Sequence, residues 1–142
     1  MKLLSKLAKL SAARRRLLLE SWARLLGASL AVRVLPASSM TRMWSGNAAE
    51  RSAPAPGAPS RDDICWSVQK AAALIPGATC LSQAIVARRM LINAGYAAQV
   101  HVGVQLGGER PLHAHAWVIS DGRIVAGANA VAGYMPLRRS AS

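Results

Sequence analysis

Cys80 and two histidines, His113 and His115, are the residues of this chain whose types and spacing could do chemistry. Cys80 stands at the expected start of a helix, and a helix N-terminus stabilises the thiolate, which is the nucleophilic form of cysteine. The histidines fall on a segment of period two, so alternation places them with Trp117 on one face of a strand. A strand histidine that reaches the sulfur could act as its base, which predicts nucleophilic chemistry at a carbonyl group.

Blander interpretations of the same residues stay open. A cysteine near a helix start is often a buried apolar residue, and strand histidines are often only hydrogen-bonded. A zinc site built from Cys65, Cys80 and the three histidines is another alternative, but the chain has no C-x-x-C or H-x₃-H spacing of the kind that zinc sites use. We therefore expect no metal and no cofactor.

The elements that must position these residues can be predicted from apolar periodicity, caps and breakers. Three helices are expected, over 12–35, 61–75 and 80–94. After Gly95 the period changes to two, and turns divide the remainder into strands near 99–104, 112–119 and 123–126. Helices followed by an antiparallel meander predict an α+β fold, in which N-terminal helices and the cysteine-bearing helix pack on a small sheet.

Composition divides the chain into a basic helical segment (1–44), a linker rich in Pro, Gly and Ser (45–60) and a core that carries the candidate chemistry (61–142). The net charge is +12, and ten of the 18 basic residues lie within 1–51. This positive field suits an anionic partner surface. The chain has no nucleic-acid signature, so we expect no nucleic-acid partner and a solvated or protein-docking surface instead.

The helix over 12–35 is expected to be largely packed through a stripe of Leu18, Trp22, Leu25 and Val32. A basic amphipathic stretch with a tryptophan could also lie on an anionic bilayer, so peripheral membrane contact stays open. Charged residues interrupt its apolar run, which falls short of a membrane span. Two cysteines make no disulfide framework and no signal peptide is evident, so we expect a reducing cytoplasm.

Five short motifs occur along the chain in a fixed order. They are Pro76-Gly77-Ala78-Thr79-Cys80-Leu81, Leu91-Ile92-Asn93-Ala94-Gly95-Tyr96, Val102-Gly103-Val104, His115-Ala116-Trp117-Val118 and Asp121-Gly122. Together they resemble the lasso-peptide biosynthesis B proteins, which belong to the transglutaminase-like superfamily and resemble papain-like cysteine proteases. The match covers about residues 62–137, and the helix that ends at Pro36 is similar to the family's N-terminal segment.

The resemblance implies a cysteine peptidase that removes the leader from a ribosomally made precursor peptide in lasso-peptide maturation. It implies Cys80 as the nucleophile and His115 as the general base and acid. His113 then lines the substrate cleft, with Trp117 beside it and most simply a packing residue. The chain is similar to the split form of the family, which implies three partners: the precursor peptide, a separate leader-recognition protein and an asparagine-synthetase-like cyclase. The basic N-terminal region is a candidate docking surface.

The family completes its triad with an aspartate on the strand after the histidine strand. Here a two-residue turn at Asp121-Gly122 sets His115 opposite Ala128, so no acid stands there. Asn129 is the nearest polar residue and needs a β-bulge to face His115. Asp121 is a less favoured third member because it lies in the turn. A backbone carbonyl or another residue is the remaining candidate to hold the His115 ring. Because no acid stands opposite His115, a second hypothesis is that the chain is a non-catalytic scaffold that binds the precursor or the cyclase. A third is that it is an acyltransferase of the transglutaminase type.

Overall fold

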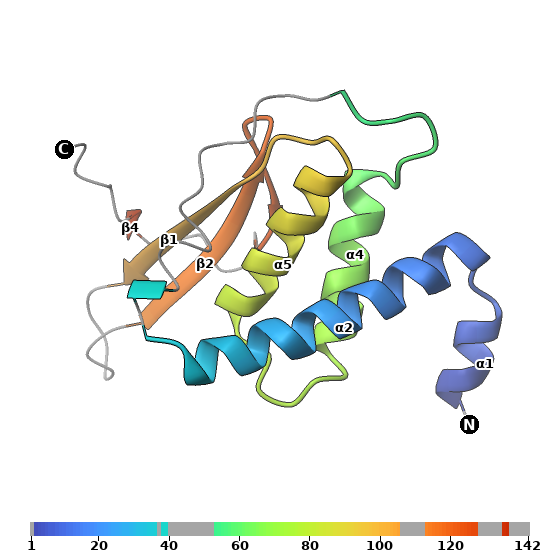
Figure 1. Ribbon diagram of the computed structural model, residues 1–142, viewed down its shortest axis with the longest axis horizontal. Helices are drawn as coiled ribbons and strands as arrows, with labels where there is room; N and C mark the ends of the chain where they lie inside the picture. The colour runs from blue at the N-terminus through green and yellow to red at the C-terminus, as the bar shows by residue number, and fades with distance from the viewer. Residues whose placement is uncertain (1, 37, 40–52, 106–112, 128–134, 137–142) are drawn as a thin grey trace.

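The computed structural model describes residues 2–36, 38–39, 53–105, 113–127 and 135–136, and within them helices and a small sheet form two layers (Figure 1). The helices are α1 (Lys2–Ala8), α2 (Ala12–Val34), α4 (Arg61–Ala72) and α5 (Cys80–Asn93). The strands are β1 (Gln99–Gln105), β2 (His113–Ser120), β3 (Arg123–Ala126) and β4 (Met135–Pro136). The α+β class is therefore confirmed, and β4 is the one described strand that the sequence did not predict.

A capping box fixes the start of α5. The Thr79 hydroxyl accepts a hydrogen bond from the Ser82 amide at 3.2 Å, and the Ser82 hydroxyl accepts one from the Thr79 amide at 3.0 Å. Two otherwise unpaired amides are thus satisfied in a reciprocal arrangement, which favours a helix that begins at Cys80. The helix ends where expected, because Gly95 has a φ of +95° and a Cβ there would lie 2.9 Å from the backbone of Pro54.

One hydrophobic core joins the N-terminal helix to the rest of the chain. Leu25 of α2, Ile64 of α4, Leu91 of α5 and Val118 of β2 are all essentially inaccessible to solvent. Between α2 and α4 the hydroxyls of two buried serines, Ser21 and Ser67, lie 2.8 Å apart. Such small side chains allow the two helices to approach closely. The expected division of the chain at 45–60 stays a prediction, since residues 40–52 lie outside the described residues.

Only one face of α2 is packed, contrary to expectation. Leu18 and Leu25 are buried against α4 and α5 as predicted, but Trp22 is 43% exposed. The buried face follows Leu18, Ser21, Leu25 and Ala28, a spacing of three and four residues, and Trp22 lies to one side of it. The predicted stripe was wrong at Trp22. The helix has two apolar faces, and the stripe combined residues from both of them.

The sheet has the strand order β3-β2-β1-β4, and every pair is antiparallel. The predicted turn between β2 and β3 is confirmed: Asp121 and Gly122 both have positive φ, as a tight two-residue hairpin turn requires. The regular register expected beyond the turn is wrong. Ile119 pairs with Ile124 but Val118 pairs with Ala126, so β3 carries a β-bulge. The bulge moves the end of β3 by one residue along β2.

Arg61, the first residue of α4, ties the helical layer to the β2–β3 hairpin. Its guanidinium group donates to the Ser120 hydroxyl at 3.0 Å and forms an ion pair with Asp121. The same group lies over the Tyr96 ring, 4.4 Å from its centroid. Because Ser120 ends β2 and Asp121 begins the turn that follows, these contacts hold the hairpin against the start of α4.

We predict that Thr79→Ala lowers the free energy of unfolding by about 1 kcal/mol, the usual cost of losing an N-cap hydroxyl. Thr79→Ser keeps an oxygen at the same place and should stay within a few tenths of a kcal/mol of the wild type, on the same scale. Urea denaturation followed by circular dichroism measures both variants. An equal loss in the two would show that the Thr79 methyl group, not the cap, stabilises this helix start.

Candidate active site

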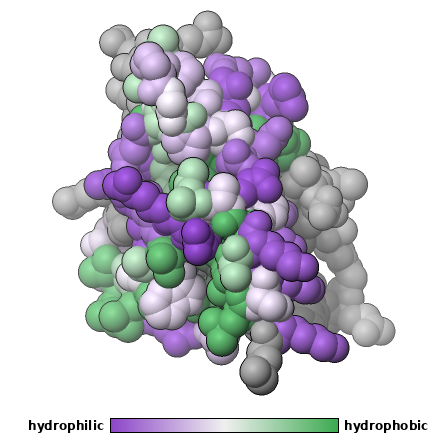
Figure 2. Space-filling view, turned by 90° about the vertical axis from the view of Figure 1, so that its right-hand side faces the viewer, coloured by the Kyte–Doolittle hydropathy of each residue, from purple (hydrophilic) through white to green (hydrophobic). Residues whose placement is uncertain are grey.

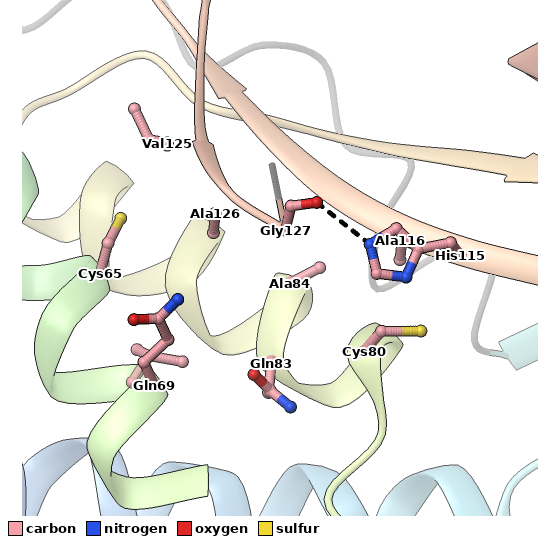
Figure 3. Close-up of a pocket in the computed structure, with 11 residues that line it drawn as sticks. Cys65, Gln69, Cys80, Gln83, Ala84, His115, Ala116, Val125, Ala126 and Gly127 are labelled. Atoms are coloured by element: carbon pink, nitrogen blue, oxygen red, sulfur yellow. Dashed lines mark hydrogen bonds between the residues drawn. The ribbon is translucent and has the colours of Figure 1, made fainter. Parts of the chain in front are cut away.

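A pocket of about 280 Å³ opens between the two layers, where α4, α5, β2 and β3 meet (Figure 3). The helices contribute Cys65 and Gln69 from α4 and Cys80 and Gln83 from α5. His115 lines the pocket from the sheet side. The structure thus brings together Cys80 and His115, which the sequence places 35 residues apart. In Figure 3 the Cys80 sulfur lies on the His115 side of the pocket.

Cys80 is a free, half-buried cysteine at the first position of α5. The first four amides of a helix have no acceptor within it. Here the Thr79 amide is satisfied by the Ser82 hydroxyl and the Ser82 amide by the Thr79 hydroxyl. The amides of Cys80 and Leu81 are the two that remain without an intrahelical acceptor. They therefore supply N–H donors next to the thiol.

The His115 imidazole is held by a backbone carbonyl. Its Nε2 atom lies 3.1 Å from the carbonyl oxygen of Gly127, which follows β3 (Figure 3). A carbonyl can only accept a hydrogen bond, so in the neutral ring Nε2 carries the proton and Nδ1 keeps its lone pair. The contact therefore selects the tautomer in which Nδ1 can take a proton from a nearby donor.

The bulge in β3 and a glycine together make this contact. Gly127 has a φ of +80°, and a Cβ at this position would lie 2.9 Å from the Ala116 carbonyl and 3.0 Å from the Trp117 Cβ. No side chain fits so close to β2. The role of Gly127 was not predicted from the sequence. A glycine at the end of a short strand was the one feature that could have indicated it.

Asp121 and Asn129 are the two side chains that the sequence offered as the third member of a catalytic triad. Asp121 lies in the turn at the far end of β2 from His115, and its carboxylate is paired with Arg61. The β-bulge on which the Asn129 hypothesis depended is present. Asn129 itself lies outside the described residues, so its role stays a prediction.

Trp117 packs beside the catalytic candidate and is not among the residues that line the pocket. The indole is buried, and its ring stacks on the His115 ring with centroids 6.4 Å apart and planes 22° apart. His101 of β1 stacks on the same indole at 6.1 Å. Trp117 thus limits the rotation of His115. The His113 side chain lies outside the described residues.

Cys65, the second thiol of the pocket, is in an environment that disfavours its ionisation. Burial, and to a lesser extent the nearby charge of Asp62, raises the pKa of Cys65 to about 11. At neutral pH this thiol is protonated and a poor nucleophile. From the sequence, Cys65 was a candidate metal ligand but not a candidate nucleophile. Within the described residues, no three His, Cys, Asp or Glu side chains are grouped so that they could hold a metal ion.

We predict that iodoacetamide at pH 7–8 modifies Cys80 well before Cys65 in the folded protein. A raised pKa leaves less thiolate at a given pH, so labelling of Cys65 should stay slow up to about pH 9. Mass spectrometry of the two cysteine peptides measures both rates. In concentrated urea the rates should become similar. Faster labelling of Cys65 in the folded state would contradict this assignment.

Gly127→Ala should disturb the His115 ring, because the added Cβ meets backbone atoms of β2 that cannot move aside. We expect NMR of the ring nitrogens to show a loss of the single Nε2–H tautomer. Gly122→Ala is the matched control, since Gly122 also has positive φ but nothing lies within 4 Å of its Cβ position. Both variants carry the strain of a left-handed residue, about 1–2 kcal/mol. A tautomer change in both would assign the effect to strain alone.

Comparison with known proteins agrees with this arrangement. A family model described as the transglutaminase-like superfamily matches residues 13–139. The matched region runs from α2 through β4 and contains both Cys80 and His115. Neither the curated proteins nor the solved structures gave a match.

Proposed function

Because the chain belongs to the transglutaminase-like superfamily, we propose that it is a cysteine peptidase that removes the leader from a ribosomally made precursor peptide in lasso-peptide maturation. The superfamily includes cysteine peptidases and acyltransferases. The observation that carries the proposal is the shared pocket of Cys80 and His115, with the His115 Nε2 atom engaged by Gly127. The ordered motifs around both residues support the choice of leader cleavage over other reactions.

The first half of the reaction forms an acyl-enzyme. His115 Nδ1 takes the proton of the Cys80 thiol, and the sulfur attacks the scissile carbonyl carbon. The carbonyl oxygen becomes negatively charged, and the amides of Cys80 and Leu81 are the donors available to stabilise it. His115 then gives its proton to the leaving amine as the C–N bond breaks. The leader stays attached to Cys80 as a thioester.

The second half regenerates the enzyme. His115 Nδ1 takes a proton from water, the hydroxide attacks the thioester carbonyl, and the carbon–sulfur bond breaks. Cys80 recovers its proton, and the leader departs with a free carboxylate. Throughout, the Gly127 carbonyl accepts a hydrogen bond from the Nε2–H group of His115. This bond stabilises the ring when it is positively charged. This replaces part of what an aspartate does in a triad, although a neutral carbonyl stabilises an imidazolium less than a carboxylate does.

The pocket suits the side chain of a peptide substrate. Its walls are partly apolar, from Val68, Ala84 and Val125, and two carboxamides, Gln69 and Gln83, provide hydrogen-bonding groups. No charged side chain is among the described residues that line it. An uncharged residue next to the scissile bond would fit best.

The proposal includes partners. A separate leader-recognition protein would hold the precursor and raise its local concentration at the pocket. The asparagine-synthetase-like cyclase would then close the ring on the released segment. The two free thiols suit a reducing compartment such as the cytoplasm.

The test incubates the chain with candidate precursor peptides and leader-recognition proteins sought in its own genome, and follows cleavage by mass spectrometry. Cys80→Ala and His115→Ala should each slow cleavage by about a thousandfold or more, because nucleophile and base act as a unit. His113→Ala should stay within about tenfold of the wild type, since the resemblance gives this histidine no role in proton transfer. Normal cleavage by Cys80→Ala would end the proposal.

An acyltransferase of the transglutaminase type is the second candidate, and the superfamily match favours it over a non-catalytic scaffold. In this case the thioester on Cys80 is attacked by an amine and not by water. Adding a primary amine such as glycine ethyl ester separates the two reactions. A conjugate formed in preference to the free carboxylate would replace peptidase with acyltransferase.

A further inference from the structure

The solvent-facing side of α2 is apolar over four turns. Leu19, Trp22, Leu26, Leu30 and Val34 recur at a spacing of three and four residues, and all five are exposed. At about 1.5 Å per residue this ridge is roughly 22 Å long. Among the described residues, Leu74 and Ile124 are the only large exposed apolar side chains outside α1, α2 and Leu35. The exposed hydrophobic surface is thus concentrated on one helix, which lies along an edge of the molecule (Figure 1).

Positive charge surrounds this apolar ridge. Arg15 and Arg16 stand one turn before Leu19, and Arg33 stands near its other end. All three are exposed, as are Lys2, Lys6 and Lys9 in and after α1. Glu20 is the one acidic residue before position 50, and it is paired with Arg24. Figure 2 shows apolar side chains gathered among hydrophilic ones toward the lower edge of this face.

We propose that α1 and the exposed face of α2 bind the surface of an anionic lipid bilayer. The ridge is the outer side of a helix and carries leucines and a tryptophan, with cations flanking it. This combination lets a helix lie in a membrane interface. Arginine and lysine side chains reach the lipid phosphates while the apolar residues enter the acyl boundary. No helix among the described residues is long and apolar enough to cross a membrane, so contact is at the surface.

Charge argues against a second copy of the chain as the occupant. Two chains of net charge +12 repel each other, and they would meet through their most basic segments. An anionic bilayer provides the opposite field over a flat area, which matches a ridge that runs along the edge of the molecule. Binding should therefore weaken as the salt concentration rises.

The experiment measures sedimentation of the full chain with vesicles of phosphatidylcholine and phosphatidylglycerol, and with vesicles of phosphatidylcholine alone. We expect binding to the anionic vesicles and little to the neutral ones. Leu26→Glu should lower the partition coefficient about tenfold, since it replaces an inserted apolar group with a charge that the lipids repel. Leu30→Glu is a second variant with the same expectation.

Ile124→Glu is the matched control, because Ile124 is 40% exposed and Leu26 is 41% exposed, but Ile124 lies on the hairpin. It should bind within about twofold of the wild type, since it adds the same charge away from the ridge. Cys80→Ala should bind normally, which separates this proposal from the proposed reaction. Circular dichroism checks that each variant folds.

Three outcomes would overturn the proposal. The first is the absence of binding to anionic vesicles, and the second is an equal loss of binding in Leu26→Glu and Ile124→Glu. The third is a concentration-dependent dimer of the wild type in light scattering that Leu26→Glu abolishes while vesicle binding is unaffected. This dimer would assign the ridge to contact between copies of the chain.

Discussion

The capping box at Thr79 is the interaction on which the geometry of the site depends. It fixes the residue at which α5 begins, and hence which side chain occupies the first helical position. A start one residue later would leave Cys80 at the N-cap, where the backbone is not helical and the thiol points in a different direction. The cap also engages the amides of Thr79 and Ser82, so those of Cys80 and Leu81 stay available. Nucleophile placement and oxyanion donors therefore follow from one local arrangement.

The other half of the site comes from the sheet and depends on the packing of the two layers. His115 lies on a central strand between β1 and β3, with Trp117 stacked beside it. Arg61 links the start of α4 to the end of β2, and Val118 packs in the core that α5 also lines. A local helix start and a long-range layer contact thus meet in one pocket. Disturbing either would separate the thiol from the imidazole without changing either residue.

The sequence was enough to predict the α+β class, the starts of α4 and α5 and the hairpin at Asp121-Gly122. These features are coded locally, by caps, breakers and periodicity. A β-bulge and a backbone carbonyl were alternatives that the sequence left open, but the carbonyl that holds His115 could not be identified, because it depends on how β3 settles against β2 once both are packed. The exposure of Trp22 was missed for a related reason. A helix with two apolar faces does not reveal which one the core will take.

The carbonyl that holds His115 belongs to the main chain, and this changes what mutation can do to the site. An aspartate or asparagine in the same role can be lost through a single substitution of its side chain. Every amino acid has a main-chain carbonyl oxygen, so the hydrogen-bond acceptor at position 127 has no sequence signature of its own. What can be lost is its position, through any residue larger than glycine. Among the described residues, a search for catalytic side chains alone would therefore miss the main-chain group that orients the imidazole.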